Sequence, residues 1–366
     1  MSIQAEHTIG QAWTAGAAEA APVGIAVVGA GYWGPNLVRN AVQSRATSLI
    51  AVCDANVSRA RALAGTLASV DATDDLSRLL DDPAIEAIAV ATPAGTHLEV
   101  AMTAIEAGKH VLVEKPLASS YAAGRALVTA AEDRGVVLMC DHTYCYTPAV
   151  QRIRELVHTG VLGDVHFIDS VRINLGLVQR DINVLWDLAP HDLAILDFIL
   201  PKGCLPVAVA AQGADPIGAG QECVAYLTLQ LPHGAIAHVH VNWLSPIKVR
   251  TTTIGGSSRT LVWDDLNPSQ RISVFDRGVD LADPTEIDAD DRRQAMVSYR
   301  SGDMIAPALP EREALQGVMG EFAECIRTGR ASRTDGRSGL RVLDILEAAS
   351  RSLEFHGAVV PLRNDR

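Results

Sequence analysis

A glycine-rich turn near the start of the chain directly follows a short apolar run. Residues 23–29 (VGIAVVG) have the composition of a buried strand, residues 29–34 (GAGYWG) form the turn, and residues 35–44 have a helical pattern. In such a GxGxxG turn the first glycine allows the tight bend, the second lets the backbone approach a pyrophosphate, and the third permits close helix–strand packing. Free N–H groups at the start of the helix can then bind phosphate oxygens. The candidate cofactor-binding residues of this turn are Gly29, Gly31, Tyr32, Trp33 and Gly34.

An acidic residue ends the second apolar run. Residues 48–54 (SLIAVCD) predict another buried strand, and Asp54 lies 20 residues beyond Gly34. A carboxylate here can hold the adenosine ribose hydroxyls of NAD and would repel the 2′-phosphate of NADP. We therefore expect NAD as the cofactor, with NADP less favoured. Arg59 lies nearby in the sequence, and an arginine at such a place can accommodate the 2′-phosphate of NADP. The alternative, a glycine-rich turn with an incidental aspartate, is disfavoured by the order strand, turn, helix, strand and acid.

The first part of the chain alternates strand-like apolar runs with helical patterns. The predicted strands are 23–29, 48–54, 87–91, 110–114 and 136–140. The predicted helices are 35–44, a segment ending near 68, 74–80, 96–107 and 118–134. Strands that alternate with helices of this length predict βαβ units and a doubly wound parallel sheet, the Rossmann architecture.

The pattern changes after about residue 145. A helix is predicted at 148–158, and alternating runs broken by turns predict an open, mostly antiparallel sheet. The predicted strands of this sheet are 164–174, 207–212, 223–231, 235–243, 249–255 and 259–263. Residues 276–310 are polar and rich in Pro and Asp, which predicts a long surface loop, and 311–328 and 338–355 predict closing amphipathic helices. The fold class is therefore α/β, with a flexible leader at 1–22, a Rossmann domain at 23–145 and an α+β domain at 146–366.

Composition excludes several classes of partner. The net charge of −12 argues against binding to nucleic acid or to an anionic membrane surface, because both need a basic face. No apolar run reaches the length of a membrane span. The six cysteines are scattered without a CxxC pair, so we expect no metal site and reduced thiols in a cytoplasmic protein.

A lysine lies at the end of the predicted strand 110–114. In Glu114-Lys115-Pro116, the proline disfavours helical angles at Lys115. The carboxyl ends of parallel strands are where ligands of α/β proteins bind. A lysine there can lie beside a nicotinamide and stabilise a developing alkoxide. The alternative is a solvated lysine at a strand end.

An aspartate and a histidine lie four residues apart in the second half. On a helix, Asp187 and His191 share one face. Histidine suits proton transfer at neutral pH, and the aspartate could orient its ring. Two structural alternatives stay open: Asp187 as a helix N-cap with Pro190 in the first turn, and His191 as a half-buried imidazole without a chemical role.

Together these motifs resemble a known family. The strand–GAGYWG–helix start, the EKP segment at 114–116 and the W-D-x-x-x-H-D segment at 186–192 occur in the order found in the glucose–fructose oxidoreductase, inositol dehydrogenase and rhizopine-catabolism (Gfo/Idh/MocA) family. The similarity extends from Val23 to Phe355. It implies a Rossmann domain followed by a substrate-binding α/β domain whose open sheet often forms the subunit interface, and hence a homodimer or homotetramer.

The resemblance also implies roles for single residues. Lys115 matches the lysine beside nicotinamide and substrate, and His191, paired with Asp187, matches the histidine that exchanges a proton with the substrate hydroxyl. The segments expected to border the cofactor are Thr92-Pro93 with His97, and Glu114 with Lys115. The segment 141–144 (DHTY) matches the stretch leading into the second domain, which more often begins with Gly, and Cys145-Tyr146 stands where many members have Arg-Phe.

Three further segments resemble members from sugar and secondary-metabolite pathways. They are 174–176 (NLG), 181–183 (DIN) and 242–246 (NWLSP). A sugar or amino sugar, either free or nucleotide-linked, is therefore the expected substrate. The candidate hydroxyl-binding residues are Tyr144, Arg172, Asn174 and Asn183, and a purely structural role is equally open for each.

The expected reaction is hydride transfer between nicotinamide and a secondary alcohol or ketone of a small sugar-like molecule. His191 would take the hydroxyl proton, Asp187 would hold the imidazole, and Lys115 would stabilise the charge on oxygen. The alternatives are an inositol or hexose dehydrogenase of catabolism, a non-catalytic dinucleotide-binding sensor such as the family's yeast repressor of galactose genes, and a dehydratase or glycosidase that uses NAD transiently.

Overall fold

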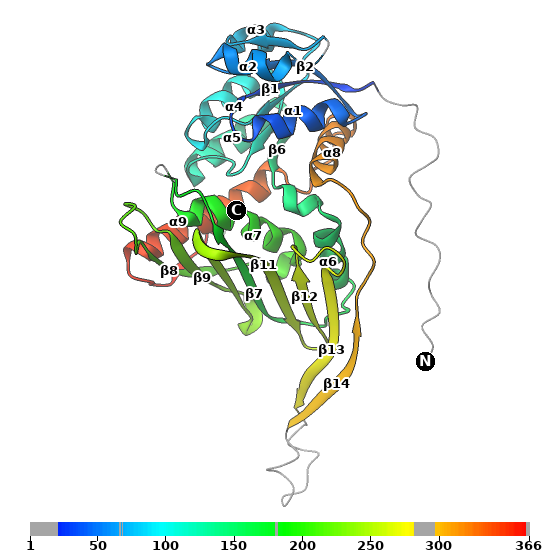
Figure 1. Cartoon of the computed structure of the whole chain (residues 1–366), viewed down its shortest axis with the longest axis vertical. Helices are drawn as coiled ribbons and strands as arrows, with labels where there is room; N and C mark the ends of the chain where they lie inside the picture. Colours follow the sequence, from blue (N-terminus) through cyan, green and yellow to red (C-terminus); the bar gives the residue numbers. More distant parts are fainter. Residues whose placement is uncertain (1–20, 66, 68, 180–181, 282–296, 364–366) are drawn as a thin grey trace, which may run out of the picture.

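A computed structural model of the chain describes residues 21–65, 67, 69–179, 182–281 and 297–363 (Figure 1). Nearly all of the expected leader, residues 1–22, lies outside these ranges. The N-terminal part contains a six-stranded parallel sheet in the order β3-β2-β1-β4-β5-β6. Its strands are β1 (Val23–Val28), β2 (Thr47–Cys53), β3 (Asp71–Thr73), β4 (Ala87–Val90), β5 (His110–Glu114) and β6 (Leu138–Asp141).

This sheet confirms the predicted doubly wound Rossmann architecture. Every residue of β1 is buried, as expected for a parallel strand covered on both faces. The surrounding helices are α1 (Gly34–Gln43), α2 (Val57–Ala64), α3 (Leu76–Asp81), α4 (His97–Glu106) and α5 (Tyr121–Arg134). The sequence did not predict β3, because three residues are too few to show a periodic pattern.

The second sheet has nine strands in the order β14-β13-β12-β11-β7-β10-β9-β8-β15. β7 and β10 run parallel and the other neighbours run antiparallel, which confirms the expected open, mostly antiparallel sheet. Its strands are β7 (Val165–Leu175), β8 (Ala208–Ala214), β9 (Val224–Gln230), β10 (Ile236–Asn242), β11 (Leu244–Gly256), β12 (Thr260–Asp264), β13 (Ile272–Leu281), β14 (Val297–Ile305) and β15 (Val360–Pro361).

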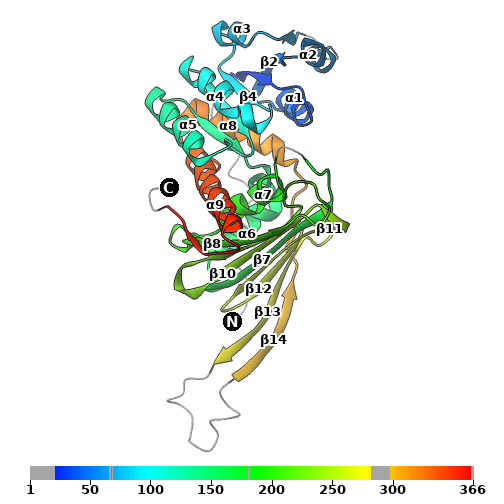
Figure 2. The ribbon, with the colours of Figure 1, turned by 90° about the vertical axis from the view of Figure 1, so that its left-hand side faces the viewer.

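The expectation of a long loop at 276–310 is wrong for much of that segment. β13 and β14 pair antiparallel and form a ribbon that projects from the body of the molecule (Figures 1 and 2), while residues 282–296 lie outside the described ranges. Val279 and Tyr299 on this ribbon are exposed. Because the ribbon is held by strand pairing more than by burial, its sequence lacks the alternation that reveals a half-buried strand.

Helices join the two sheets. α7 (Val184–Ile199) and α9 (Gly336–Glu354) cover one face of the nine-stranded sheet, near α6 (Pro148–His158) (Figure 2). α8 (Ala314–Thr328) returns to pack on α1, and α9 also packs on α5. The C-terminal helices therefore contact the Rossmann sheet as well as the second sheet. In the described part of the chain, no helix has the length and apolar character needed to span a membrane.

Candidate active site

The glycine turn has the shape that a dinucleotide requires. Gly29 has a φ of 104°, and a Cβ there would lie 2.5 Å from the carbonyl oxygen of Ala91, so only glycine fits. A Cβ on Gly34 would lie 2.1 Å from the carbonyl oxygen of Gly29, which explains the close helix–strand packing. A Cβ on Gly31, in contrast, would meet no protein atom within 4 Å. Gly31 therefore borders open space on the side where a pyrophosphate would approach.

The start of α1 and the end of β2 complete this region. α1 has no side-chain N-cap and no acidic residue in its first turn. Pro35 has no N–H and the N–H of Asn36 donates to the carbonyl of Trp33, so the N–H of Gly34 is the one at this helix start that can meet an anion. The Asp54 carboxylate accepts hydrogen bonds from the N–H of Ala30 (2.8 Å) and of Asn56 (2.9 Å), which hold it beside the glycine turn. These residues fit NAD: the helix start and Gly31 would hold the pyrophosphate, and Asp54 the adenosine ribose.

The two aromatic residues of the turn differ in their exposure and contacts. Tyr32 is 89% exposed, whereas the indole N–H of Trp33 donates to the Asp141 carboxylate at 3.1 Å. Asp141 is buried at the end of β6, and its burial raises its pKa. Trp33 thus ties the glycine turn to the far strand of the sheet, and contact of either aromatic residue with a cofactor stays a prediction.

His97 connects two turns at the same edge of the sheet. Its Nδ1 lies 2.8 Å from the carbonyl oxygen of Pro116, and its Nε2 lies 2.8 Å from that of Thr92. Burial lowers the pKa of this imidazole. The ring therefore fastens the turn after β4 to the turn that carries Lys115. The hydroxyl of Thr92 is buried and has no hydrogen-bond partner among the described residues.

Lys115 and Asp187 meet although they are 72 residues apart in the chain. Lys115 Nζ donates to the backbone carbonyl of Asp187 (3.0 Å) and to its carboxylate (3.3 Å). The other carboxylate oxygen accepts the indole N–H of Trp243 at 3.0 Å. Both side chains of the ion pair are mostly buried, with 15% and 18% of their surfaces exposed.

This geometry corrects two expectations about Asp187. Asn183, not Asp187, caps α7, so Pro190 lies inside the helix and not in its first turn. Asp187 was also expected to orient the ring of His191, but its carboxylate oxygens bond to Lys115 and Trp243, and no hydrogen bond joins it to His191 among the described residues. The ammonium donor follows β5 of the Rossmann sheet, whereas the indole donor lies between β10 and β11 of the second sheet, so Asp187 positions Lys115.

His191 is held in its neutral form. Burial is the main cause that lowers its pKa well below the ordinary value, and the charges of Lys115 and Arg172 act in the same direction. Its Nδ1 is buried without a hydrogen-bond partner among the described residues, and the ring of Tyr144 lies 5.1 Å away in an edge-on arrangement. A neutral imidazole can accept a proton, which is what a general base requires.

Glu114 adds a further carboxyl group beside Lys115. Its burial raises its pKa to about 8, and the neighbouring Asp141 and Asp187 carboxylates add to the shift while Lys115 opposes it. Glu114 lies opposite Asp141 in the pairing of β5 with β6. The site thus combines a protonated carboxyl group, a lysine–aspartate ion pair and a neutral histidine.

The remaining predicted substrate residues have different surroundings. Arg172 is buried and donates from Nε (2.7 Å) and Nη2 (3.2 Å) to the Asp192 carboxylate. The Asn183 side chain accepts from the N–H of Trp186 and donates to Glu222. Both residues therefore have structural partners. Asn174 lies near the end of β7, and its side chain forms no hydrogen bond with the described residues, while Asp181, in the 181–183 segment, lies outside those residues.

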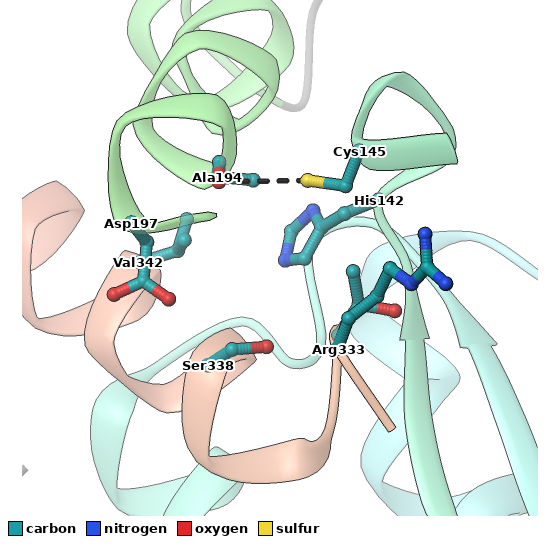
Figure 3. A pocket seen from close by; sticks show the side chains of 8 residues that line it. His142, Cys145, Ala194, Asp197, Arg333, Ser338 and Val342 are labelled. Carbon is teal, nitrogen blue, oxygen red and sulfur yellow. Dashed lines mark hydrogen bonds between the residues drawn. The ribbon is translucent and has the colours of Figure 1, made fainter. Parts of the chain in front are cut away.

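Several residues near this site were given no role from the sequence. Trp243, Asp192 and His142 lie within segments that carry the family resemblance, and Arg250 lies outside them; each contacts or influences the residues above. His142 lines a separate small pocket between α7 and α9, with Cys145 and Ser338 (Figure 3). Both of its ring nitrogens are buried without a partner among the described residues, and burial lowers its pKa to about 3. The contacts of these residues link distant segments, so spacing along the sequence carried no signal for them.

Comparisons with known proteins agree with this geometry. Residues 23–142 match the model of an oxidoreductase family with an NAD-binding Rossmann fold (GFO_IDH_MocA), and residues 150–262 match the GFO/IDH/MocA C-terminal domain. The UDP-N-acetylglucosamine 3-dehydrogenase of Acidithiobacillus ferrooxidans is 28% identical over 299 residues, which cover 81% of this chain and 87% of that protein. An uncharacterised oxidoreductase of Bacillus subtilis, YrbE, is 25% identical over 90% of this chain and 94% of its own.

Solved structures extend the likeness to nearly the whole chain. The structure of the Acidithiobacillus ferrooxidans enzyme superposes with a TM-score of 0.76, at 25% identity, over 91% of this chain and 98% of its own. GenD2 from gentamicin A biosynthesis, solved in complex with NAD, gives a TM-score of 0.77 at 25% identity over 96% and 99% of the two chains. This chain therefore belongs to the GFO/IDH/MocA family of oxidoreductases and carries that family's NAD-binding Rossmann domain.

Proposed function

We propose that this chain transfers hydride between NAD and a secondary alcohol or ketone of an amino sugar or nucleotide-linked sugar. The observation that carries the proposal is the Lys115–Asp187 ion pair at the carboxyl edge of the Rossmann sheet, close enough to the neutral His191 to influence its pKa. A binding protein without chemistry has no need for a lysine and a neutral base at one place.

The residues divide the work of the reaction. When bound, NAD supplies the hydride chemistry. His191 accepts the proton of the substrate hydroxyl, because its imidazole is neutral at physiological pH. Lys115 Nζ has three N–H donors, and its contacts with the described residues both go to Asp187, so a donor remains for the substrate oxygen. Asp187 and Trp243 hold that ammonium group in place. In the reverse direction the same groups protonate and polarise a ketone.

The relatives support the choice of substrate. Two similar proteins are a UDP-N-acetylglucosamine 3-dehydrogenase and GenD2 from gentamicin A biosynthesis. A second candidate, a catabolic inositol or hexose dehydrogenase, is supported by the scyllo-inositol 2-dehydrogenase of Bacillus subtilis, which is 26% identical over 76% of this chain. The departure of Asp141 and Cys145-Tyr146 from the common family pattern favours neither candidate.

We also propose that the subunits form a homodimer or homotetramer through the nine-stranded sheet. Its outer face carries no described helix (Figure 2), and Phe167, Tyr226 and Ile236 are exposed on it. The ring of Tyr226 stacks on that of His240, with centroids 4.3 Å apart. Light scattering after size exclusion should give twice or four times the 38.8 kDa chain mass.

The six free thiols, of which all but Cys204 are buried, support the expected cytoplasmic location.

A substrate panel followed at the NADH absorbance band tests the proposed reaction. The panel contains UDP-N-acetylglucosamine, N-acetylglucosamine, scyllo-inositol and glucose, each with NAD at pH 8. We expect NADH to form fastest with a nucleotide or amino sugar. Fastest turnover with inositol or glucose would favour the catabolic candidate. Tight NAD binding without turnover of any member would favour a sensor, and net conversion without NADH accumulation would indicate transient use of NAD.

A further inference from the structure

Two arginines lie side by side on the inner face of the nine-stranded sheet. Arg172 on β7 and Arg250 on β11 are directly paired across the strands, so their side chains leave the sheet on the same face. This is the face covered by α7, the helix that carries Asp187 and His191. Both guanidinium groups approach the ring of Tyr144, at 4.4 Å for Arg172 and 5.9 Å for Arg250.

The two arginines differ in how their charge is neutralised. Arg172, with 4% of its side chain exposed, forms two hydrogen bonds with Asp192, whose carboxylate also accepts the hydroxyl of Ser170. Arg250, with 31% exposed, has one ion-pair contact with Asp265 at 3.5 Å and donates no side-chain hydrogen bond to any described residue. An arginine stacked near an aromatic ring presents its N–H edge outward, in the geometry that binds a carboxylate or phosphate.

Arg250 is also close to the reacting groups. The ring of Tyr144, which Arg250 approaches from one side, lies 5.1 Å from the ring of His191. The charge of Arg250 is among those that lower the pKa of His191. A sugar whose hydroxyl meets His191 can therefore place a charged substituent near Arg250.

From this arrangement we infer that Arg250 binds an anionic group of the substrate, a carboxylate or a phosphate. The inference rests on the proposed function and narrows its substrate class to acidic or phosphorylated sugars. In the absence of substrate, the Asp265 carboxylate contacts the guanidinium of Arg250 through one ion pair of 3.5 Å. A substrate anion that binds Arg250 in bidentate fashion displaces this contact. Arg172, already paired with Asp192, keeps Tyr144 and α7 in place.

Binding of paired probes tests the inference without requiring turnover. The full chain is saturated with NADH, so that anions do not occupy the pyrophosphate region, and titrated calorimetrically with D-glucose, D-glucuronate and D-glucose 6-phosphate. We expect at least one of the two anions to bind about tenfold or more tightly than glucose. Preference for glucuronate alone identifies a carboxylate site, and preference for the phosphate alone identifies a phosphate site.

Variants separate this role from a purely structural one. Arg250→Gln should abolish the preference for the anion, and Arg250→Lys should retain part of it. Asp265→Asn, which removes the competing carboxylate, should strengthen binding of the anion, and a purely structural Arg250 would not give that result. Arg277→Gln, which removes an exposed guanidinium from β13, is the matched control and should behave as wild type.

The inference is overturned if the wild type binds neither anion better than glucose, or if Arg250→Gln keeps the preference while its NADH affinity is unchanged. The proposed function fails separately: absence of NADH formation with every sugar, together with intact anion binding, would refute the oxidoreductase reaction and leave the Arg250 site standing.

Discussion

Gly29 and Gly31 belong to the same turn, yet their replacement by alanine should have opposite consequences. Gly29 has a φ of 104°, which costs an L-residue about 1–2 kcal/mol, and its Cβ would also lie 2.5 Å from a backbone oxygen. Gly29→Ala should therefore lower the free energy of unfolding by about 2 kcal/mol or more. The corresponding fall in Tm is roughly 2–3 °C or more for a chain of 366 residues. Gly31→Ala should leave stability within about 0.5 kcal/mol of wild type, because its Cβ would meet no protein atom within 4 Å.

In cofactor binding, the large effect should instead be seen in Gly31→Ala, as a loss of NADH affinity. The Cβ of Gly31→Ala would occupy the space through which the pyrophosphate approaches, so the Kd for NADH should rise about tenfold or more. Thermal unfolding and titration of NADH fluorescence measure the two effects on the same samples. Gly203→Ala, whose Cβ also meets no atom within 4 Å, is the control for the substitution itself and should change neither. Unchanged NADH affinity in Gly31→Ala would refute the assignment of this turn.

Three further predictions concern the second half of the site. His142 is neutral in the folded protein with a pKa of about 3, whereas in the unfolded chain it takes up a proton below about pH 6.5. The contribution of His142 to the free energy of unfolding should therefore fall by about 2 kcal/mol between pH 7.5 and pH 5. Chemical unfolding of wild type and His142→Asn at both pH values should show this loss as the difference between the two proteins, and equal pH dependence would contradict it. Because the pKa of His191 is lowered, the acid limb of kcat/KM for alcohol oxidation should lie well below pH 6.5; a limb at or above 6.5 would contradict the neutral base. Asp192→Ala leaves the buried Arg172 without its carboxylate partner and should cost about 3–5 kcal/mol in denaturant unfolding, and a loss below 1 kcal/mol would argue against the buried pair.

Local features of the sequence predicted the fold around the glycine turn well. The turn at Gly29–Gly34, the acid at Asp54 and the strand that ends at Glu114 each follow from residues that are neighbours in the chain. Glycine conformations, strand periodicity and helix starts are properties of such short segments. The parallel sheet that brings their ends together was predictable for the same reason.

The substrate half depends on contacts between distant segments. The role of Asp187 was predicted from its spacing to His191, but the structure shows its carboxylate bonded to Lys115 and to Trp243, which lie 72 and 56 residues away. The pairing of Arg250 with Arg172 depends on the register of β11 against β7, including an irregularity between Leu244 and Val249. No pattern within one segment encodes that register.

The central claim is that Lys115, although it borders the cofactor, is needed for the chemistry and contributes little to NADH affinity, and Lys115→Ala tests it most directly. Turnover is followed at the NADH absorbance band with the best substrate of the panel, and the NADH affinity is measured by fluorescence on the same preparation. Lys202→Ala, which removes an exposed lysine far along the chain, is the control and should match wild type in both measurements. The account predicts that Lys115→Ala binds NADH within about threefold of wild type and that kcat falls by about 100-fold or more, since a preorganised donor to a developing oxyanion contributes on that order. Turnover equal to wild type in Lys115→Ala would contradict the proposed mechanism.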